Sequence, residues 1–402
     1  MSLESLREVA LDWPFPRTEE GTLPPVLDEL RRKPPTAVRI PEGATSSRLA
    51  WLVTRYEDVR TALAHPLLSA DETRPGAPVR IQLPPGERPS SYLRMDDPEH
   101  GRLRGLIQKE FTARRVRGLE DDISALTERL LDEFAALPQP ADLHDAFSRK
   151  LPTLVIGRLL GVPEADYAFF IETTRVVISQ EDPAVAYGAY LDISTYLREL
   201  AEAKLEEPKD DLISRLVTYV ASGEITLSEL VGIALLVLVA GHETTTNQIA
   251  LNILSLLDDD ELRERVAADD GALVPEFVEE SLRFWSISQD AIVRQAIEDV
   301  EIGGVLFEAG DPVVISIPAG NHDERMYGCP HKLDIDRDSS GHLQWGYGPH
   351  FCQGKPLAQL EMHLAMRALL RRFPDMKLAA EPQTLFRKNT VFHGLTHLPV
   401  TW

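Results

Sequence analysis

The feature that most constrains this chain is a glycine-rich loop near its C-terminal end, Trp345–Gly354, with the sequence WGYGPHFCQG. The loop places Cys352 directly before an apolar-periodic run from Lys355 through Leu369, which predicts a helix. Pro356 suits the first turn of such a helix, where its missing N–H costs nothing. At a helix N-terminus, the dipole and the free backbone N–H groups favour a thiolate over a thiol. Cys352 is therefore predicted to be either a nucleophile or a metal ligand.

Composition limits the classes of function open to the chain. It has 402 residues, with 42 basic and 64 acidic side chains and a net charge of -22. Nucleic acid is disfavoured as a ligand because phosphate binding needs a cationic surface. The only two cysteines are Cys329 and Cys352, so no disulfide framework organises the fold and a reducing compartment is expected. The charged N-terminus lacks the apolar core of a signal peptide, and the longest apolar run, Ile233–Ala240, is too short to span a bilayer. These features predict a cytoplasmic protein that does not bind membranes.

Helical periodicity dominates the chain, with short strand-like stretches between the helices. Residues 120–220 show helical patterns with two short breaks, and apolar alternation predicts strands at Arg48–Thr54 and within 292–320. A strand pair with a tight turn is expected at Val391–Leu395. Because helical and strand-like segments are interleaved, we expect one mainly α domain with small β-sheets, spanning residues 1–402.

The longest predicted helix, from Leu227 to about Leu257, has an unusual centre. Thr226 and Glu229 have the spacing of a capping box and mark its start. Its middle, residues 240–246, has the sequence AGHETTT, in which one glycine and three threonines lower helix propensity. Threonine hydroxyls also compete for backbone carbonyls. We therefore expect a bend here, either kept for function or merely tolerated.

Two pairs of polar residues at helical spacing are candidate site residues. His100 and Arg104, within MDDPEHGRLR, are one turn apart, so they form either an exposed basic face or two donors for an anionic group. Glu280 and Arg283 are spaced i, i+3 in a short predicted helix, a pairing that is common on protein surfaces.

Three chemistries fit a cysteine in this setting. Zinc is disfavoured, because the available pairs have Cys-x-His or His-x-Cys spacing instead of two to four intervening residues. A cysteine nucleophile has His350 nearby as a base, but no third residue completes a recognisable triad. A haem thiolate needs glycines beside the cysteine, cations for two propionates and a distal element that handles dioxygen and protons, and the chain offers each part. The possible zinc ligands are Cys329, His331, His342, His350 and Cys352.

Taken together, the motifs resemble those of the cytochrome P450 family, of the soluble bacterial, actinomycete-like kind, over nearly the whole chain. The loop WGYGPHFCQG is similar to the family's cysteine loop, and AGHETT is similar to the oxygen-binding stretch of its long distal helix. Glu280 and Arg283 match the family's Glu-x-x-Arg pair, and Arg337 matches the third member of that network. MDDPEHGRLR matches the segment whose His and Arg hold haem propionates.

By this resemblance, Cys352 is the metal ligand, and Glu243 and Thr244 form a catalytic acid–alcohol pair that delivers protons. The resemblance also implies a set of haem-binding residues spread over four segments. They are His100, Arg104, Ala240, Gly241, Arg294, Trp345, Gly346, His350, Cys352 and Gly354.

The resemblance implies a triangular α-helical prism with haem b between the distal helix and the cysteine loop. It implies a monooxygenase that depends on O2 and NAD(P)H and hydroxylates or epoxidises its substrate. No fused reductase domain is expected within 402 residues, so the electron donors would be a ferredoxin and its reductase, acting on a monomer. An acidic ferredoxin would meet a basic docking face. Its expected members are Arg102, Lys109, Arg114, Arg115, Lys355, Arg367 and Arg371.

Two residues depart from the family pattern. Trp345 stands where the family usually has phenylalanine, so its larger ring and N–H are expected to change packing or hydrogen bonding near the sulfur, and with it the reduction potential. Lys355 stands where many relatives have a small residue and is expected to help dock an acidic partner.

The segments that line the substrate pocket by resemblance mix apolar and polar residues. They are 75–92, about 165–190, the distal helix before Ala240, Ile287–Ile292 and Val391–Leu395, and the residues expected to contact substrate are Ile287, Asp290, Ala291, Phe392 and His393. We therefore expect a medium or large natural product, such as a macrolide or peptide, free or carrier-bound, and a role in secondary metabolism. Two other functions stay open: a haem-binding recruiter of carrier proteins, and a peroxygenase or haem isomerase. The Glu243–Thr244 pair favours oxygen activation over both.

Overall fold

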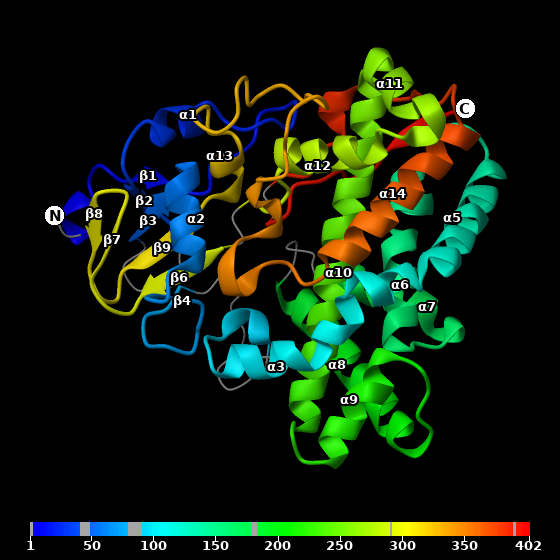
Figure 1. Ribbon diagram of the computed structural model, residues 1–402, viewed down its shortest axis with the longest axis horizontal. Helices are drawn as coiled ribbons and strands as arrows, with labels where there is room; N and C mark the ends of the chain where they lie inside the picture. The colour runs from blue at the N-terminus through cyan, green and yellow to red at the C-terminus, as the bar shows by residue number, and fades with distance from the viewer. Residues whose placement is uncertain (1–2, 41–48, 79–90, 178–182, 290–291, 389–390) are drawn as a thin grey trace.

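The structure is a computed structural model that describes residues 3–40, 49–78, 91–177, 183–289, 292–388 and 391–402. Most strands lie on the side of the molecule that holds the N-terminus, and the long helices fill the other side (Figure 1). This arrangement confirms the predicted mainly α fold with small sheets. The helices are α1 (Val26–Arg31), α2 (Tyr56–Ala64), α3 (Glu99–Ile107), α4 (Ala113–Arg117), α5 (Glu120–Ala135), α6 (Lys150–Leu160), α7 (Tyr167–Val177), α8 (Pro183–Glu206), α9 (Leu212–Ala221), α10 (Leu227–Asp258), α11 (Asp260–Gly271), α12 (Val274–Trp285), α13 (Ile317–Asn321) and α14 (Lys355–Arg372).

The described strands form three small sheets. Their orders are β1-β2-β3-β9-β6-β4, β10-β11-β5 and β7-β8. In the largest sheet β3 runs parallel to β9 and antiparallel to β2, and β6 is antiparallel to β9, with Arg294 opposite Val313. The strands are β1 (Leu11–Asp12), β2 (Thr36–Arg39), β3 (Leu49–Val53), β4 (Leu68–Ser69), β5 (Ala141–Asp142), β6 (Val293–Ala296), β7 (Val300–Ile302), β8 (Val305–Phe307), β9 (Pro312–Ile315), β10 (Lys377–Leu378) and β11 (Pro399–Thr401).

The strand predictions within residues 49–54 and 292–320 are confirmed, whereas the strand pair expected at Val391–Leu395 is wrong. That segment makes only isolated bridges, Ser288 to Phe392 and Phe386 to Leu395. Its backbone is held instead by contacts to other elements. His393 N–H, for example, donates to Ile287 O at 2.8 Å.

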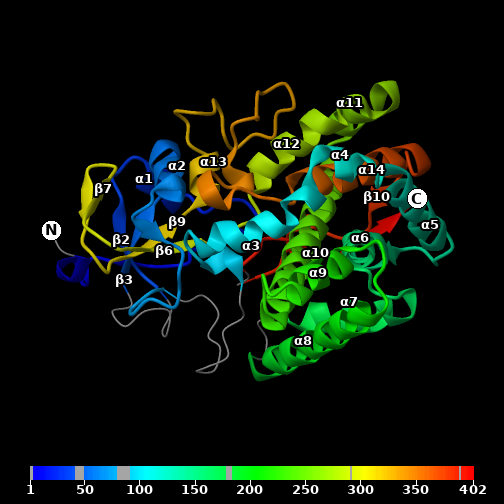
Figure 2. The same cartoon turned by 60° about the horizontal axis from the view of Figure 1, so that its bottom comes forward.

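Helix α10 is the central element of the helical side. Its capping box forms as predicted, with Thr226 N–H donating to Glu229 Oε2 at 2.7 Å and Glu229 N–H donating to Thr226 Oγ1 at 3.1 Å. The helix packs on α6, α8 and α14, with α14 on the opposite side from α8 (Figure 2). By length and composition alone α10 could cross a membrane, but most of its apolar stretch is buried in this core, as expected for a central helix.

The weak centre of α10 does not interrupt the helix, since every residue from Leu227 to Asp258 is helical. Gly241 sits where α10 meets α6, and a Cβ there would lie 2.5 Å from Ile156 Cδ1. Glycine therefore allows α6 and α10 to pack closely here, and a larger residue would require the Ile156 side chain to move, so packing is one reason for glycine at this position.

Candidate functional site

The cysteine loop is fixed to its own flank by a backbone hydrogen bond. Cys352 N–H donates to Trp345 O at 2.7 Å, and the loop then enters α14 at Lys355. Gly346 has a φ of 73°, the left-handed region that favours glycine. Burial raises the pKa of the Cys352 thiol, and the N–H of Gly354 and the charge of Arg104 oppose this. The helix start is predicted to favour a thiolate, and burial of the sulfur opposes that preference in the chain by itself. Burial dominates, and coordination by a metal is what removes such a proton.

Cationic and imidazole groups from three distant segments meet beside this loop. The rings of His100 on α3 and His350 in the loop have centroids 4.2 Å apart. Arg104 Nη2 donates to Phe351 O at 2.6 Å, which ties α3 to the loop. Arg294 on β6 is buried, and burial lowers its pKa to about 10, with Asp96 opposing the shift. The structure thus brings together the four residues predicted to hold propionates: His100, Arg104, Arg294 and His350.

These residues have unmet hydrogen-bonding capacity that suits an anion. His100 is buried, and its Nε2 has no hydrogen-bond partner in the described part of the chain. Burial and the neighbouring charges of Arg294, His100 and Arg104 together lower the pKa of His350 to about 3. A cationic site that disfavours additional positive charge is a site that stabilises a carboxylate. The donor set, with a cysteine beside it, fits haem.

On the distal helix, Ala240 and Thr244 lie one turn apart on a strip of partly exposed surface within a mostly buried helix. Thr244 Oγ1 donates to Ala240 O at 2.7 Å. Threonine in a helix commonly makes this bond. While it makes this bond, the hydroxyl oxygen can still accept a hydrogen bond from a group at the haem, whereas donating to such a group requires it to release Ala240 O.

Glu243 faces away from that strip and is buried. Arg387 Nη1 lies 2.5 Å from its Oε1, and Asn247 Nδ2 donates to the same oxygen at 3.0 Å. Arg387 also donates to Leu395 O at 3.0 Å, so the carboxylate is bound to the C-terminal segment. Among the described residues no hydrogen bond joins Glu243 to Thr244. The predicted acid–alcohol pair is present in sequence, but the two side chains are engaged separately.

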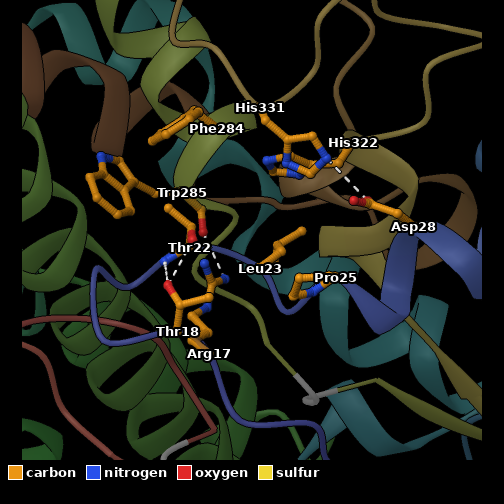
Figure 3. Close-up of a pocket in the computed structure, with 10 residues that line it drawn as sticks. All are labelled: Arg17, Thr18, Thr22, Leu23, Pro25, Asp28, Phe284, Trp285, His322 and His331. Atoms are coloured by element: carbon orange, nitrogen blue, oxygen red, sulfur yellow. Dashed lines mark hydrogen bonds and ion pairs between the residues drawn. The ribbon is translucent and has the colours of Figure 1, made fainter.

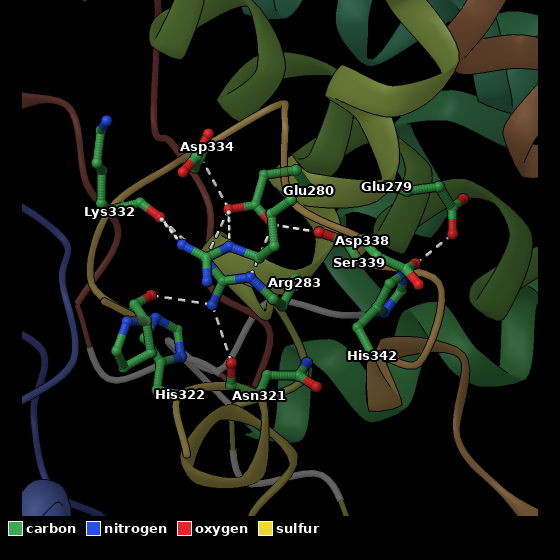
Figure 4. A network of polar contacts seen from close by, with 12 residues as sticks. Glu279, Glu280, Arg283, Asn321, His322, Lys332, Asp334, Asp338, Ser339 and His342 are labelled. Atoms are coloured by element: carbon green, nitrogen blue, oxygen red, sulfur yellow. Dashed lines mark hydrogen bonds and ion pairs between the residues drawn. The ribbon is translucent and has the colours of Figure 1, made fainter. Parts of the chain in front are cut away.

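The predicted Glu280–Arg283–Arg337 network forms, and its Glu280–Arg283 pair is fully buried (Figure 4). Arg283 makes a two-pronged contact with Glu280, with both N–O distances at 2.8 Å and both side chains 0% exposed. Arg337 Nε lies 3.3 Å from Glu280 Oε1. Arg283 also donates to the carbonyls of Asn321, Pro330 and Lys332. The network thereby fixes the irregular chain between β9 and the cysteine loop.

The predicted substrate-contact residues are only partly placed. Asp290 and Ala291 lie outside the described residues, as does most of loop 75–92. Ile287 is buried. The ring of His393 is also buried and stacks on Phe386 at 5.4 Å, so its contact with substrate stays a prediction.

A residue that sequence reasoning missed, Arg17, clamps the segment after α12. Its Nη2 donates to the carbonyls of Trp285 and Ser286 at 2.8 and 2.9 Å, and its Nε donates to Gln289 Oε1 at 3.0 Å. Arg17 and Trp285 both line the pocket shown in Figure 3. The clamp closes one side of a pocket of about 240 Å³, which has none of the predicted site residues in its lining. The other lining residues are Thr18, Thr22, Leu23, Pro25, Asp28, Phe284, His322 and His331.

Arg387, Asn247 and Glu279 contact predicted site residues without having been recognised in the sequence, and Arg17 was missed as the residue that holds the segment after α12. Arg17 and Arg387 act across more than a hundred positions of sequence separation, so no local pattern marks them. Asn247 had a detectable signal, because it follows Glu243 by four residues on the same helix face. Glu279 directly precedes the recognised Glu280. The i, i+3 spacing to Arg283 identified Glu280, whereas Glu279 lies on a different face of the helix.

A cysteine loop that leads into a helix, a cationic cluster beside it and a long distal helix define a haem-thiolate protein, and comparisons with known proteins agree. The model of the family Cytochrome P450 matches residues 191–392. Cytochrome P450 GfsF of Streptomyces halstedii is 38% identical over 406 residues, which cover 98% of this chain and 97% of that protein. Mycinamicin IV hydroxylase/epoxidase of Micromonospora griseorubida is 37% identical and covers 97% and 98%.

A solved structure agrees with these sequence comparisons. The mycinamicin VIII C21 methyl hydroxylase MycCI of Micromonospora griseorubida, bound to mycinamicin VIII, matches with a TM-score of 0.90 at 34% identity and covers 98% of this chain and 100% of that one. The chain belongs to the cytochrome P450 family. It is a haem-thiolate monooxygenase, as the resemblance of its motifs implied.

Proposed function

We propose that this enzyme hydroxylates or epoxidises a macrolide-type natural product in secondary-metabolite tailoring, as a cytoplasmic, monomeric, single haem domain. The names of the two mycinamicin-modifying relatives support the substrate class. The observation that carries the assignment of the site is the meeting of His100, Arg104, Arg294 and His350 beside Cys352.

In this proposal each part of the site has one task. Cys352 ligates the iron, and the four cationic or imidazole residues bind the propionates. The haem, when bound, supplies dioxygen activation and oxygen transfer to a C–H or C=C bond. Thr244 Oγ1 holds a proton close to the haem, and Glu243 brings protons from solvent once its carboxylate separates from Arg387.

The function is tested by turnover with a ferredoxin, its reductase and NADPH on a macrolide panel chosen by substrate-induced spectral shift. Wild-type enzyme should form oxygenated product, and Thr244→Ala should keep consuming NADPH but form about tenfold less product per NADPH, with hydrogen peroxide in its place. Thr127→Ala is the control, since Thr127 is a buried threonine on α5 whose hydroxyl donates to its own helix at Ile123 O at 2.8 Å. An unchanged product yield in Thr244→Ala would remove the proton-relay role. Turnover with peroxide alone, and none with electron donors, would favour the peroxygenase alternative.

The electron donor is proposed to be an acidic ferredoxin that docks where α4 and the short helix at Gln108–Phe111 pack on α14. Most cations of the predicted docking face are already paired: Arg102 with Glu229, Arg115 with Glu110, Arg371 with Glu128, and Lys355 near Glu279. Lys109 and Arg114 are exposed and have no ion pair with any described residue. The exposed rings of Tyr347 and Phe351 in the cysteine loop add an apolar contact area.

Charge reversal at Arg114 is therefore expected to slow reduction by the ferredoxin about three- to tenfold at low salt, because steering between opposite charges is lost. The measurement is the stopped-flow rate of haem reduction at several ionic strengths. Arg198→Glu, at an exposed position on α8, is the matched control. Equal slowing by both variants, or a rate that does not change with salt, would contradict this docking face.

A further inference from the structure

Glu279 directly precedes the buried Glu280 on α12. Its carboxylate contacts both flanks of the cysteine loop. On the N-terminal flank, Oε2 lies 3.1 Å from His342 Nε2 and accepts a hydrogen bond from Trp345 Nε1 at 3.4 Å. On the C-terminal flank, Oε1 accepts a hydrogen bond from Gln359 Nε2 at 2.7 Å, and Lys355 Nζ lies 4.0 Å from Oε2.

The chemistry of these contacts explains why a carboxylate stands here. The indole of Trp345 is buried, and a buried indole N–H needs an acceptor. Phenylalanine at this position would need none. Lys355 Nζ also lies 5.6 Å from the centre of the Trp345 ring, so the indole is held between a cation and the carboxylate that pairs with it.

Glu279 is charged under ordinary conditions. Burial by itself raises the pKa of Glu279, but hydrogen bonds from His342 and Gln359 and the charges of His342 and Lys355 lower it to about 2. The negative charge is therefore permanent at working pH. The carboxylate contacts the indole N–H of Trp345, the residue whose own carbonyl accepts the Cys352 N–H.

We propose that Glu279 is a positioning residue for the thiolate ligand, which holds Trp345 and both flanks of the cysteine loop while its charge lowers the reduction potential of the iron. The proposal rests on Cys352 being the ligand. The sign follows from electrostatics: a nearby negative charge stabilises the more positive ferric state against the ferrous state. Trp345 is the link, because its indole N–H donates to Glu279 and its carbonyl accepts the N–H of Cys352.

The test is a spectroelectrochemical titration of the holoenzyme. Glu279→Gln keeps the size of the side chain and removes the charge, and it is expected to increase the equilibrium constant for one-electron reduction about three- to tenfold, a rise of about 30 to 60 mV. Glu276→Gln, one turn earlier on the exposed side of α12, makes the same charge change and is expected to shift the potential much less. Equal shifts in the two variants would overturn the proposal.

Two further variants keep the test decisive if Glu279→Gln binds haem poorly. Lys355→Met should lower the potential, because the carboxylate then acts without its counter-charge, and Lys377→Met is its control at an exposed position on β10. In the Trp345→Phe background, the shift in reduction potential caused by Glu279→Gln should shrink by at least half. If the potential shifts of the two substitutions were fully additive, the link through the indole would be overturned. Failure of the underlying assignment is separable, since wild-type enzyme would then show no thiolate-ligated carbon monoxide spectrum at all.

Discussion

Replacing Cys352 with serine is expected to abolish the thiolate-ligated spectrum of the reduced carbon monoxide complex. Serine is a poor donor to the iron, and the strong electron donation of sulfur is what favours O–O cleavage. Loss of outer-shell partners alone costs metal sites about 10- to 100-fold, so removal of the ligand should reduce turnover by at least about 100-fold. The measurement is the difference spectrum together with NADPH-driven product formation at equal haem content.

Cys329→Ser is the matched control for this prediction. Cys329 is exposed and is the other cysteine of the chain, and its carbonyl, not its thiol, contacts Arg337. The control should keep the wild-type spectrum and activity. A normal spectrum in Cys352→Ser, or its loss in Cys329→Ser, would transfer the ligand role to the other cysteine.

The sequence was sufficient for features encoded locally. The capping box of α10 was predictable because Thr226 and Glu229 are three residues apart, and both side chains form the expected bonds. The i, i+3 spacing of Glu280 and Arg283 was also visible, although the spacing alone could not distinguish a surface pair from a buried one. Their full burial follows from the irregular segment 321–339, which folds over them.

Features that depend on distant segments were beyond local reasoning. The engagement of Glu243 by Arg387 depends on a contact across 144 positions, and no propensity or period reports it. The strand pair expected at 391–395 was wrong for the same reason, because the main-chain groups there pair with Ile287 and Arg387 instead of with each other. Several arginines of the predicted docking face pair with carboxylates of the same chain, and charge composition alone does not show which cations stay unpaired.

The charge state of Cys352 depends on two opposing effects, the helix dipole and burial, and the sequence alone does not give their sizes. A helix N-terminus stabilises a negative charge by about 0.3 to 1 kcal/mol at exposed sites. Burial acts in the opposite direction and is the dominant influence on the thiol pKa here. The sequence reveals the helix start, but only the packed structure shows how deeply the sulfur lies.

The second large effect is expected from Glu280→Ala. This change leaves the Arg283 guanidinium buried without its counter-charge, and loss of one partner of a buried pair typically costs about 3 to 5 kcal/mol. Because the same carboxylate accepts from Asp334 N–H at 2.9 Å and from Ser339 Oγ, the segment before the cysteine loop should loosen as well. We therefore expect a large fall in the midpoint of thermal unfolding and in the ratio of bound haem to protein.

A matched control separates this mechanism from a general effect of losing a carboxylate on α12. Glu276→Ala removes a carboxylate one turn earlier, where the side chain is exposed, and should change stability by less than about 0.5 kcal/mol. Arg283→Lys should behave like Glu280→Ala, since an ammonium cannot reproduce the contacts that the planar guanidinium makes with Glu280 and three carbonyls. If Glu280→Ala kept wild-type haem content and thermal stability, the network would not be what fixes the segment, and the contacts of Glu279 with the loop would have to fix it alone.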